Sequence, residues 1–155
     1  MGWLPDDFEH PTRVDLTTGH HLRPIRGSDV DIDLPAVMGS RERLWSIYGA
    51  VWGWPPATMT REQDLEDLQR HEREIEAHQS FNYALLDEEE TRLLGCVYLD
   101  PAERVGADAD ISWWVVDELV PYWVAQDWPF DQPRYVPREI SWAEWAALPE
   151  VPSGA

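Results

Sequence analysis

Four acidic residues lie where two predicted strands meet, and their carboxylates could do proton chemistry. Asp100, Glu103, Asp108 and Asp110 occupy the connection between a strand predicted at 93–99 and the next strand along the chain. A carboxylate in such a place can take a proton from an amine, directly or through one water molecule. Turn carboxylates are more often simply solvated, so the sequence alone identifies none of the four as a catalytic residue.

The histidines and the single cysteine give no second constellation. His71 and His78 fall on one face of a predicted helix with Glu74 between them, but they are two turns apart and do not form the His-Glu-x-x-His zinc motif. Packing or capping is the favoured interpretation, and no metal site is predicted. Cys96 lies in an apolar run and is interpreted as a small buried side chain. There is no Gly-x-Ser-x-Gly motif, Cys-His pairing or Walker loop, which argues against an esterase, a cysteine hydrolase or a nucleotidase.

Composition limits the class of partner. The chain has 155 residues, 43% of them hydrophobic, which predicts a single domain over 1–155. Thirty acidic and 12 basic residues give a net charge of -18, which disfavours nucleic acid and favours cationic amines or basic peptides, although acidity also serves solubility. No apolar run approaches the roughly 18 residues of a membrane span, so we expect a cytoplasmic protein with no membrane contact.

The hydrophobic pattern predicts an α/β fold in the order β-α-α-β-β-β-α-β-α. Both ends, 1–18 and 149–155, are predicted to be tails. Capping boxes at Thr60 and Ser141 give the clearest helix starts. The predicted strands span 21–26, 81–86, 93–99, 110–116 and 134–136, and the predicted helices span 33–49, 60–78, 117–128 and 141–148.

Several short phrases in this order resemble the GNAT superfamily of N-acetyltransferases. They are Leu22-Arg23-Pro24 in the first strand, Leu94-Gly95 entering the second hairpin strand, and Ile111-Ser112-Trp113-Trp114-Val115 in the next strand. The segments 48–56 and 95–101 strengthen the likeness, which covers about the first two thirds of the chain. The resemblance implies a mixed, mainly antiparallel sheet of about five strands flanked by helices.

The resemblance also implies a cofactor and a reaction. In the family, an amine attacks the thioester of acetyl-CoA, whose pantetheine pairs with the backbone of the fourth strand. Carried over to this chain, the cofactor-binding backbone is that of Trp114, Val115 and Val116. The implied acceptor is a small amine or a peptide N-terminus.

The chain departs from the family where the pyrophosphate should bind. Family members have a Gln/Arg-x-x-Gly-x-Gly/Ala loop there, because free backbone N–H groups at a helix start bind the anion. This chain has Asp117-Glu118-Leu119-Val120-Pro121-Tyr122 and no glycine between Gly106 and Gly154. Two carboxylates would repel pyrophosphate, and Pro121 lacks an N–H donor. Neither Tyr122 nor Tyr135 aligns with the family's acid tyrosine, so no catalytic acid is assigned.

Four of the 10 tryptophans would lie at the sheet's open cleft in the family layout. We predict a substrate cleft formed by Trp52, Trp54 and Trp113 with Asp100 as counter-charge, and the family layout would bring Trp114 to the same cleft. Indole faces attract ammonium and guanidinium groups. The alternative interpretation is that these indoles fill core volume.

Three functions therefore remain open from the sequence. The chain is an acetyl-CoA-dependent N-acetyltransferase with an unusual cofactor grip, a non-catalytic domain that binds a small ligand, or a protein-interaction module whose cleft a partner closes. Homodimer formation is left open as well.

Overall fold

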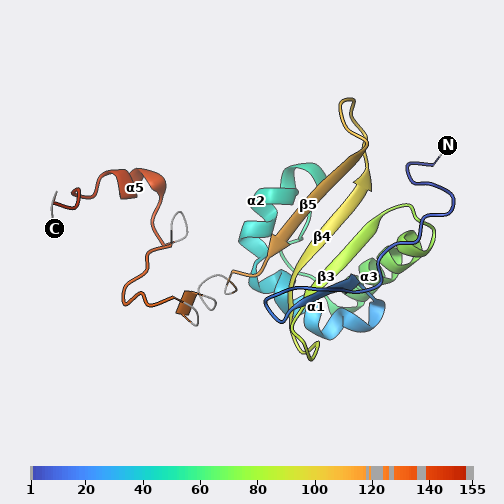
Figure 1. The fold of residues 1–155 in the computed structure, drawn as a ribbon, viewed down its shortest axis with the longest axis horizontal. Coiled ribbons are helices and arrows are strands. Elements are labelled where there is room, and N and C mark those ends of the chain that lie inside the picture. The colour runs from blue at the N-terminus through green and yellow to red at the C-terminus, as the bar shows by residue number, and fades with distance from the viewer. Residues whose placement is uncertain (1, 118, 120–123, 126–127, 136–138, 153–155) are drawn as a thin grey trace. The chain divides into compact units, whose positions relative to one another are not determined.

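The computed structural model describes residues 2–117, 119, 124–125, 128–135 and 139–152. The chain divides into two compact units, Met1–Val116 and Asp117–Ala155, which we describe separately. Figure 1 shows a sheet with packed helices in the first unit and a short helix, α5, in the second. The candidate site lies in the first unit.

The first unit is built on a five-stranded sheet in the order β1-β2-β3-β4-β5. All four neighbouring pairs of strands are antiparallel. The α/β fold with about five strands predicted from the sequence is therefore confirmed. The strands are β1 (Val14–Asp15), β2 (His21–Pro24), β3 (Phe81–Leu86), β4 (Leu93–Pro101) and β5 (Ala109–Val115).

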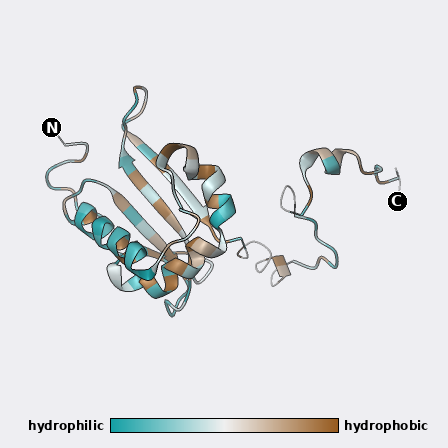
Figure 2. Ribbon diagram, turned by 180° about the vertical axis from the view of Figure 1, so that it is seen from behind, coloured by the Kyte–Doolittle hydropathy of each residue, from teal (hydrophilic) through white to brown (hydrophobic). Residues whose placement is uncertain are grey.

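Helices cover one face of this sheet (Figure 1). The view from behind shows these helices in front, with hydrophilic residues dominating the outer side of α3 (Figure 2). The helical elements of this unit are the 3-10 turn η1 (Gly27–Asp29), α1 (Val30–Gly39), α2 (Arg41–Trp52) and α3 (Arg61–Glu76).

The helix predicted over 33–49 is in fact two helices, α1 and α2. The chain leaves helical geometry at Ser40, whose φ is -112° and ψ is 17°. The Ser40 N–H donates to the carbonyl of Val37, so the last turn of α1 is tightened to 3-10 geometry before α2 begins. Periodicity did not detect the break because the apolar spacing continues across it.

The start of α3 agrees with its predicted capping box. Thr60 Oγ1 accepts from the Gln63 N–H, and the Gln63 side chain accepts from the Thr60 N–H. Leu68 and Ile75 are buried, as the predicted apolar stripe requires. The helix ends at Glu76, so the expectation that His71 and His78 share a helical face is wrong: His78 follows the helix in a left-handed conformation, with φ of 54°.

The N-terminal segment predicted as a tail is packed on the first unit. It contributes β1, which pairs with β2. The Trp3 indole N–H donates to the carbonyl of His78 at 2.8 Å, and the Tyr83 hydroxyl donates to the carbonyl of Pro11 at 2.6 Å. Prolines and polar residues indicated a tail, but these few contacts order the segment.

The second unit contains α5 (Trp142–Ala146), and its described residues Leu119, Val124 and Ala125 are also helical. Ser141 Oγ accepts from the Glu144 N–H at 3.0 Å, as predicted. Most of the helix predicted at 117–128 lies outside the described residues. In the strand predicted at 134–136, Arg134 and Tyr135 are not in a strand, and Val136 lies outside the described residues. Within the described part of the chain, no helix has the length and apolarity that crossing a bilayer would require.

Gly95 is required by the close approach of β4 and β5. A Cβ atom added at Gly95 would lie 2.2 Å from the carbonyl oxygen of Trp114. That contact is with backbone and cannot be relieved by a side-chain rotation. We expect Gly95→Ala to lower the free energy of unfolding by roughly 1–3 kcal/mol, measured by urea denaturation. The control is Gly39→Ala, where a Cβ meets nothing within 4 Å; equal losses in both variants would contradict the steric explanation.

Candidate functional site

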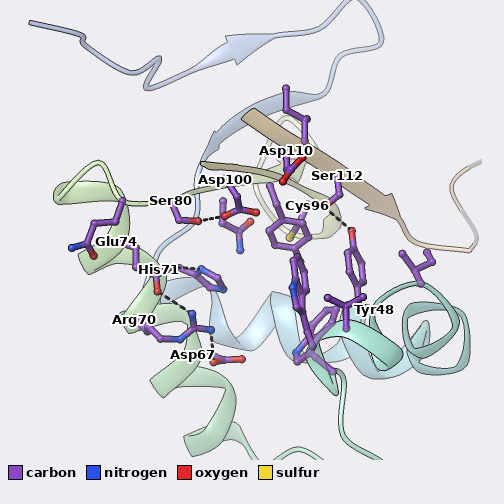
Figure 3. A pocket seen from close by; sticks show the side chains of 18 of the residues that line it. Tyr48, Asp67, Arg70, His71, Glu74, Ser80, Cys96, Asp100, Asp110 and Ser112 are labelled. Carbon is purple, nitrogen blue, oxygen red and sulfur yellow. Dashed lines mark hydrogen bonds and ion pairs between the residues drawn. The ribbon is translucent and has the colours of Figure 1, made fainter. Parts of the chain in front are cut away.

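A cavity of about 1000 Å³ opens between α2 and α3, above β4 and β5. We call it the cleft. Figure 3 shows Tyr48 from α2, His71 from α3 and Asp100 and Ser112 from the sheet directed into this space. The cleft therefore collects side chains from four elements that the sequence places far apart.

Aromatic rings form one wall of the cleft. Tyr48 stacks on Trp52 with ring centroids 4.7 Å apart and an interplanar angle of 6°. Tyr98 meets Tyr48 edge-on at 5.8 Å, and Trp54 does so at 5.9 Å. The Tyr48 hydroxyl also donates to Ser112 Oγ at 3.3 Å (Figure 3). A wall of this kind can hold an alkyl chain or the face of a cation.

Carboxylates dominate the charged lining. The acidic residues are Asp33, Asp64, Asp67, Glu74, Asp100, Glu103 and Asp110, and the arginines are Arg70 and Arg104. Arg70 is engaged by the carboxylates of Asp67, at 2.9 Å, and Glu74, at 3.0 Å (Figure 3). Because acidic groups in a cleft reinforce one another's field, the cleft attracts cations and repels anions.

Asp33 and Asp64 form a buried pair at the inner wall of the cleft. Their side chains belong to residues that are only 4% and 3% exposed. Burial raises the pKa of Asp33 well above its ordinary value, and the nearby charge of Asp64 raises it further. Burial also raises the pKa of Asp64, to about 6. Near neutral pH the two carboxyls therefore tend to retain one shared proton.

His71 is the one imidazole that lines the cleft among the described residues. Burial lowers its pKa, and the charge of Arg70 lowers it further, against the opposing effect of Glu74 and other acidic neighbours. The ring is therefore neutral at pH 7 and able to accept a proton. Glu74 Oε2 lies 3.6 Å from its Nδ1 and can stabilise the protonated form.

The residues predicted for the substrate cleft are partly brought together. Trp52, Trp54 and Asp100 line it, and Asp100 accepts a hydrogen bond from the Ser80 hydroxyl at 2.5 Å. Trp113 does not line it and is 66% exposed. Neighbouring strand residues point to opposite faces, so Trp113 lies on the face away from the helices.

Trp114 is a core residue. It is 1% exposed, and its indole N–H donates to the Tyr98 hydroxyl at 2.9 Å beneath the aromatic wall. Cys96, opposite it in β4, is also buried, and burial raises the pKa of its thiol well above the ordinary value. The core interpretation therefore fits Trp114, and Cys96 is not an activated nucleophile.

The predicted cofactor-binding backbone points in two directions. The Val116 N–H donates to the carbonyl of Leu94 at 2.8 Å, and Trp114 occupies the next hydrogen-bonded position, so both are directed toward β4. Val115 lies between them and faces the outer edge of β5. There its carbonyl accepts from the Arg43 guanidinium at 2.7 Å.

Of the four carboxylates first considered, Glu103 and Asp110 line the cleft with Asp100, and Asp108 does not.

The sequence reasoning missed Asp33 and Asp64. A signal was present: each lies four residues before a buried apolar position, Val37 and Leu68, so helical spacing puts both carboxyls on the inner face.

Known structures share this architecture. An α-N-protein acetyltransferase of ribosomal L7/L12, RimL, in complex with coenzyme A aligns with a TM-score of 0.58 at 15% identity, over 73% of this chain and 60% of that one. Ribosomal-protein-S5-alanine acetyltransferase from Vibrio fischeri aligns with a TM-score of 0.54 at 15% identity, over 75% and 68%. An acetyltransferase of the N-terminal serine of L7/L12 from Salmonella typhimurium gives 0.53 at 12%, over 74% and 61%.

These structures are longer than the present chain, which spans 60–68% of their length. No protein-family model and no curated protein sequence matches it. At this level of identity the likeness concerns the arrangement of strands and helices. The strand order, the helices over one face and these alignments together show that the chain has the fold of the GNAT N-acetyltransferases.

Proposed function

We propose that the cleft receives the amino group of a small amine or of a peptide N-terminus and that the chain acetylates it from acetyl-CoA. The observation that carries this proposal is the acidic, aromatic-walled cleft on a GNAT fold. Cationic acceptors are drawn in by the carboxylates and held along the rings of Tyr48, Trp52 and Tyr98. Two of the similar structures, the α-N-protein acetyltransferase RimL and the enzyme that modifies the N-terminal serine of L7/L12, support the same class of acceptor.

The residues at β5 fit the cofactor in part. Backbone groups of alternate residues, Ile111 and Trp113, face the outer edge of β5 and are free of the β4 ladder, as pairing with pantetheine would require. Acetyl-CoA supplies a thioester carbonyl that an amine can attack. The segment after Val116 has Asp117-Glu118 in place of a glycine-rich anion loop, so the pyrophosphate would be bound differently from the family pattern.

His71 is the candidate proton acceptor. An aliphatic amine is protonated at pH 7 and must lose a proton before it can act as a nucleophile. A neutral imidazole in the cleft can take that proton directly or through water, and Glu74 beside it stabilises the imidazolium. Tyr48 and Ser112, which share a hydrogen bond, help to orient the acceptor.

A second function is favoured by one specific observation. Carboxylates at 117 and 118 and the absence of glycine between 107 and 153 oppose the binding of a pyrophosphate. A domain with the same cleft but no cofactor would bind amines without acetylating them. The two functions predict the same amine binding and differ only in acetyl-CoA binding and turnover.

One pair of measurements tests the proposal. Calorimetric titration with acetyl-CoA should show micromolar to submillimolar binding, and an acetylation assay over a panel of amines and N-terminal peptides should show turnover. His71→Gln is expected to lower kcat by about 10²-fold or more, while amine binding is retained. His20→Gln, outside the cleft, is the control. Amine binding without acetyl-CoA binding at millimolar concentration would establish the second function instead.

A further inference from the structure

The inner wall of the cleft holds buried hydrogen-bond acceptors that lack donors. Asp64 Oδ2 and Asn82 Oδ1 have no hydrogen-bond partner in the described structure, and both residues are only 3% exposed. Asp33, 4% exposed, shares a side-chain hydrogen bond with Asp64, which leaves Asp64 Oδ2 without a donor. The three residues come from α1, α3 and β3, and all line the cleft. We call them the acceptor group.

An acceptor group of this kind is costly to the fold. A buried polar atom without a partner costs about 1–3 kcal/mol, and a charged one costs more. No ion pair among the described residues includes Asp33 or Asp64, and Arg70, the arginine of the cleft nearest to them in sequence, is engaged by Asp67 and Glu74. Such a cost is typical of sites whose missing donors arrive with a ligand.

We propose that the acceptor group binds the ammonium head of a primary amine whose alkyl chain extends along the aromatic wall. An ammonium offers three N–H donors and a positive charge, which match two carboxyls and an amide oxygen. A hydroxyl ligand would satisfy fewer acceptors and leave the charge unpaired. The apolar walls of Tyr48 and Tyr98 then cover the methylene groups.

This site specifies the substrate class, in a step that rests on the proposed function. An ammonium held between two carboxyls stays protonated, because both stabilise its charged form. It cannot be the nitrogen that attacks a thioester. The acceptor would therefore carry two amino groups, one anchored at Asp33 and Asp64 and a second that reacts nearer His71 and β5. Diamines and peptides with a lysine side chain have this chemistry.

Binding at the acceptor group should release a proton. The pair shares one proton before binding, and the ammonium takes its place. The groups that face the pair are Asp29 beside α1, Asp67 on α3, and Cys96 on β4, and none of them supplies a positive charge. Below the pKa of Asp64, about 6, the pair holds two protons and binding must displace both, whereas above it only the shared proton is displaced. Affinity should therefore rise with pH throughout the range from 5 to 8, and more steeply below pH 6.

Titration of the full chain without acetyl-CoA tests the site. The probes are n-butylamine, 1,4-diaminobutane and the neutral isostere 1-butanol, at constant salt from pH 5 to 8. We expect both amines to bind and 1-butanol to bind at least tenfold more weakly. Heats measured in buffers of different ionisation enthalpy should show proton uptake by the buffer at pH 6.

Asp64→Asn is the decisive variant. Removing the buried charge should weaken n-butylamine binding roughly 30-fold or more and remove the steeper pH dependence below pH 6. The melting temperature should rise by a few degrees at pH 7, since the fold no longer buries an ionised carboxylate at this position. Glu66→Gln, an exposed residue on the same helix with the same change in charge, should alter neither quantity.

Three results would overturn the inference: equal binding of 1-butanol and n-butylamine, unchanged affinity in Asp64→Asn, or no amine binding at 20 mM. That concentration is roughly twentyfold above a millimolar Kd. Because acetyl-CoA is absent, the outcome is independent of turnover. Acetylation of a monoamine without any effect of Asp64→Asn would retain the proposed function and remove this anchor. Amine binding with no turnover would retain this anchor and remove the proposed function.

Discussion

Arg23→Met is expected to lower the free energy of unfolding by roughly 3–5 kcal/mol, because it leaves a buried carboxylate without its partner. Arg23 is 5% exposed and donates to both oxygens of Asp29, at 2.7 and 2.9 Å. It also donates to both oxygens of Glu90, at 3.0 Å each. The guanidinium thus connects β2 to the start of α1 and to the turn before β4.

Chemical denaturation at pH 7 checks the Arg23 prediction. Arg13→Met is the matched control, since Arg13 forms an exposed ion pair with Asp15 and should change stability by less than about 1 kcal/mol. A loss in Arg23→Met no larger than in the control would show that the network is dispensable.

The same network predicts that the free energy of unfolding decreases in acid. Hydrogen bonds from Arg23 and His21 lower the pKa of Glu90 from 4.5 to about 2. A depressed folded-state pKa means that the unfolded chain binds protons first as the pH falls. Stability from Glu90 is therefore fully present above about pH 4.5 and is lost as the pH falls toward 2. Arg23→Met should remove this part of the pH dependence.

Trp114→Ala is the second large effect, a loss of roughly 3–5 kcal/mol. The indole is buried at 1% exposure between the sheet and the helices, and its N–H is satisfied by Tyr98. Truncation leaves a large void and an unpaired hydroxyl. Because Tyr98 belongs to the aromatic wall, amine binding should weaken along with stability.

The neighbouring tryptophan supplies the control. Trp113→Ala removes the same number of atoms from the same strand, but at an exposed position, so its effect should stay near 0.5 kcal/mol. Thermal and urea unfolding of the two variants give the comparison. Similar losses in both would mean that Trp113 is covered in solution, as expected if a partner chain packs on that face.

Local signals predicted most of the first unit correctly. The strand at 81–86 and the capping box at Thr60 were read directly from alternation and side-chain chemistry, and both are present. The break at Ser40 and the strand at Val14–Asp15 were not predicted. Neither leaves a mark in the apolar pattern: the break is a single non-helical residue whose N–H donates to the carbonyl of Val37, and the strand is two residues long and pairs with Leu22 and His21.

The cleft shows the same division between local and tertiary information. The sequence determined that Trp113 and Trp114 face opposite sides of a strand, that the chain is acidic, and that an anion loop is missing after Val116. Only the tertiary structure decided which tryptophan is buried, and only it placed Asp33, Asp64 and Asn82 in the lining of one cleft. The reason is physical. Alternation and capping act within a few residues, whereas sheet register and helix packing set the faces and depths at which side chains separated by 18 to 49 positions meet.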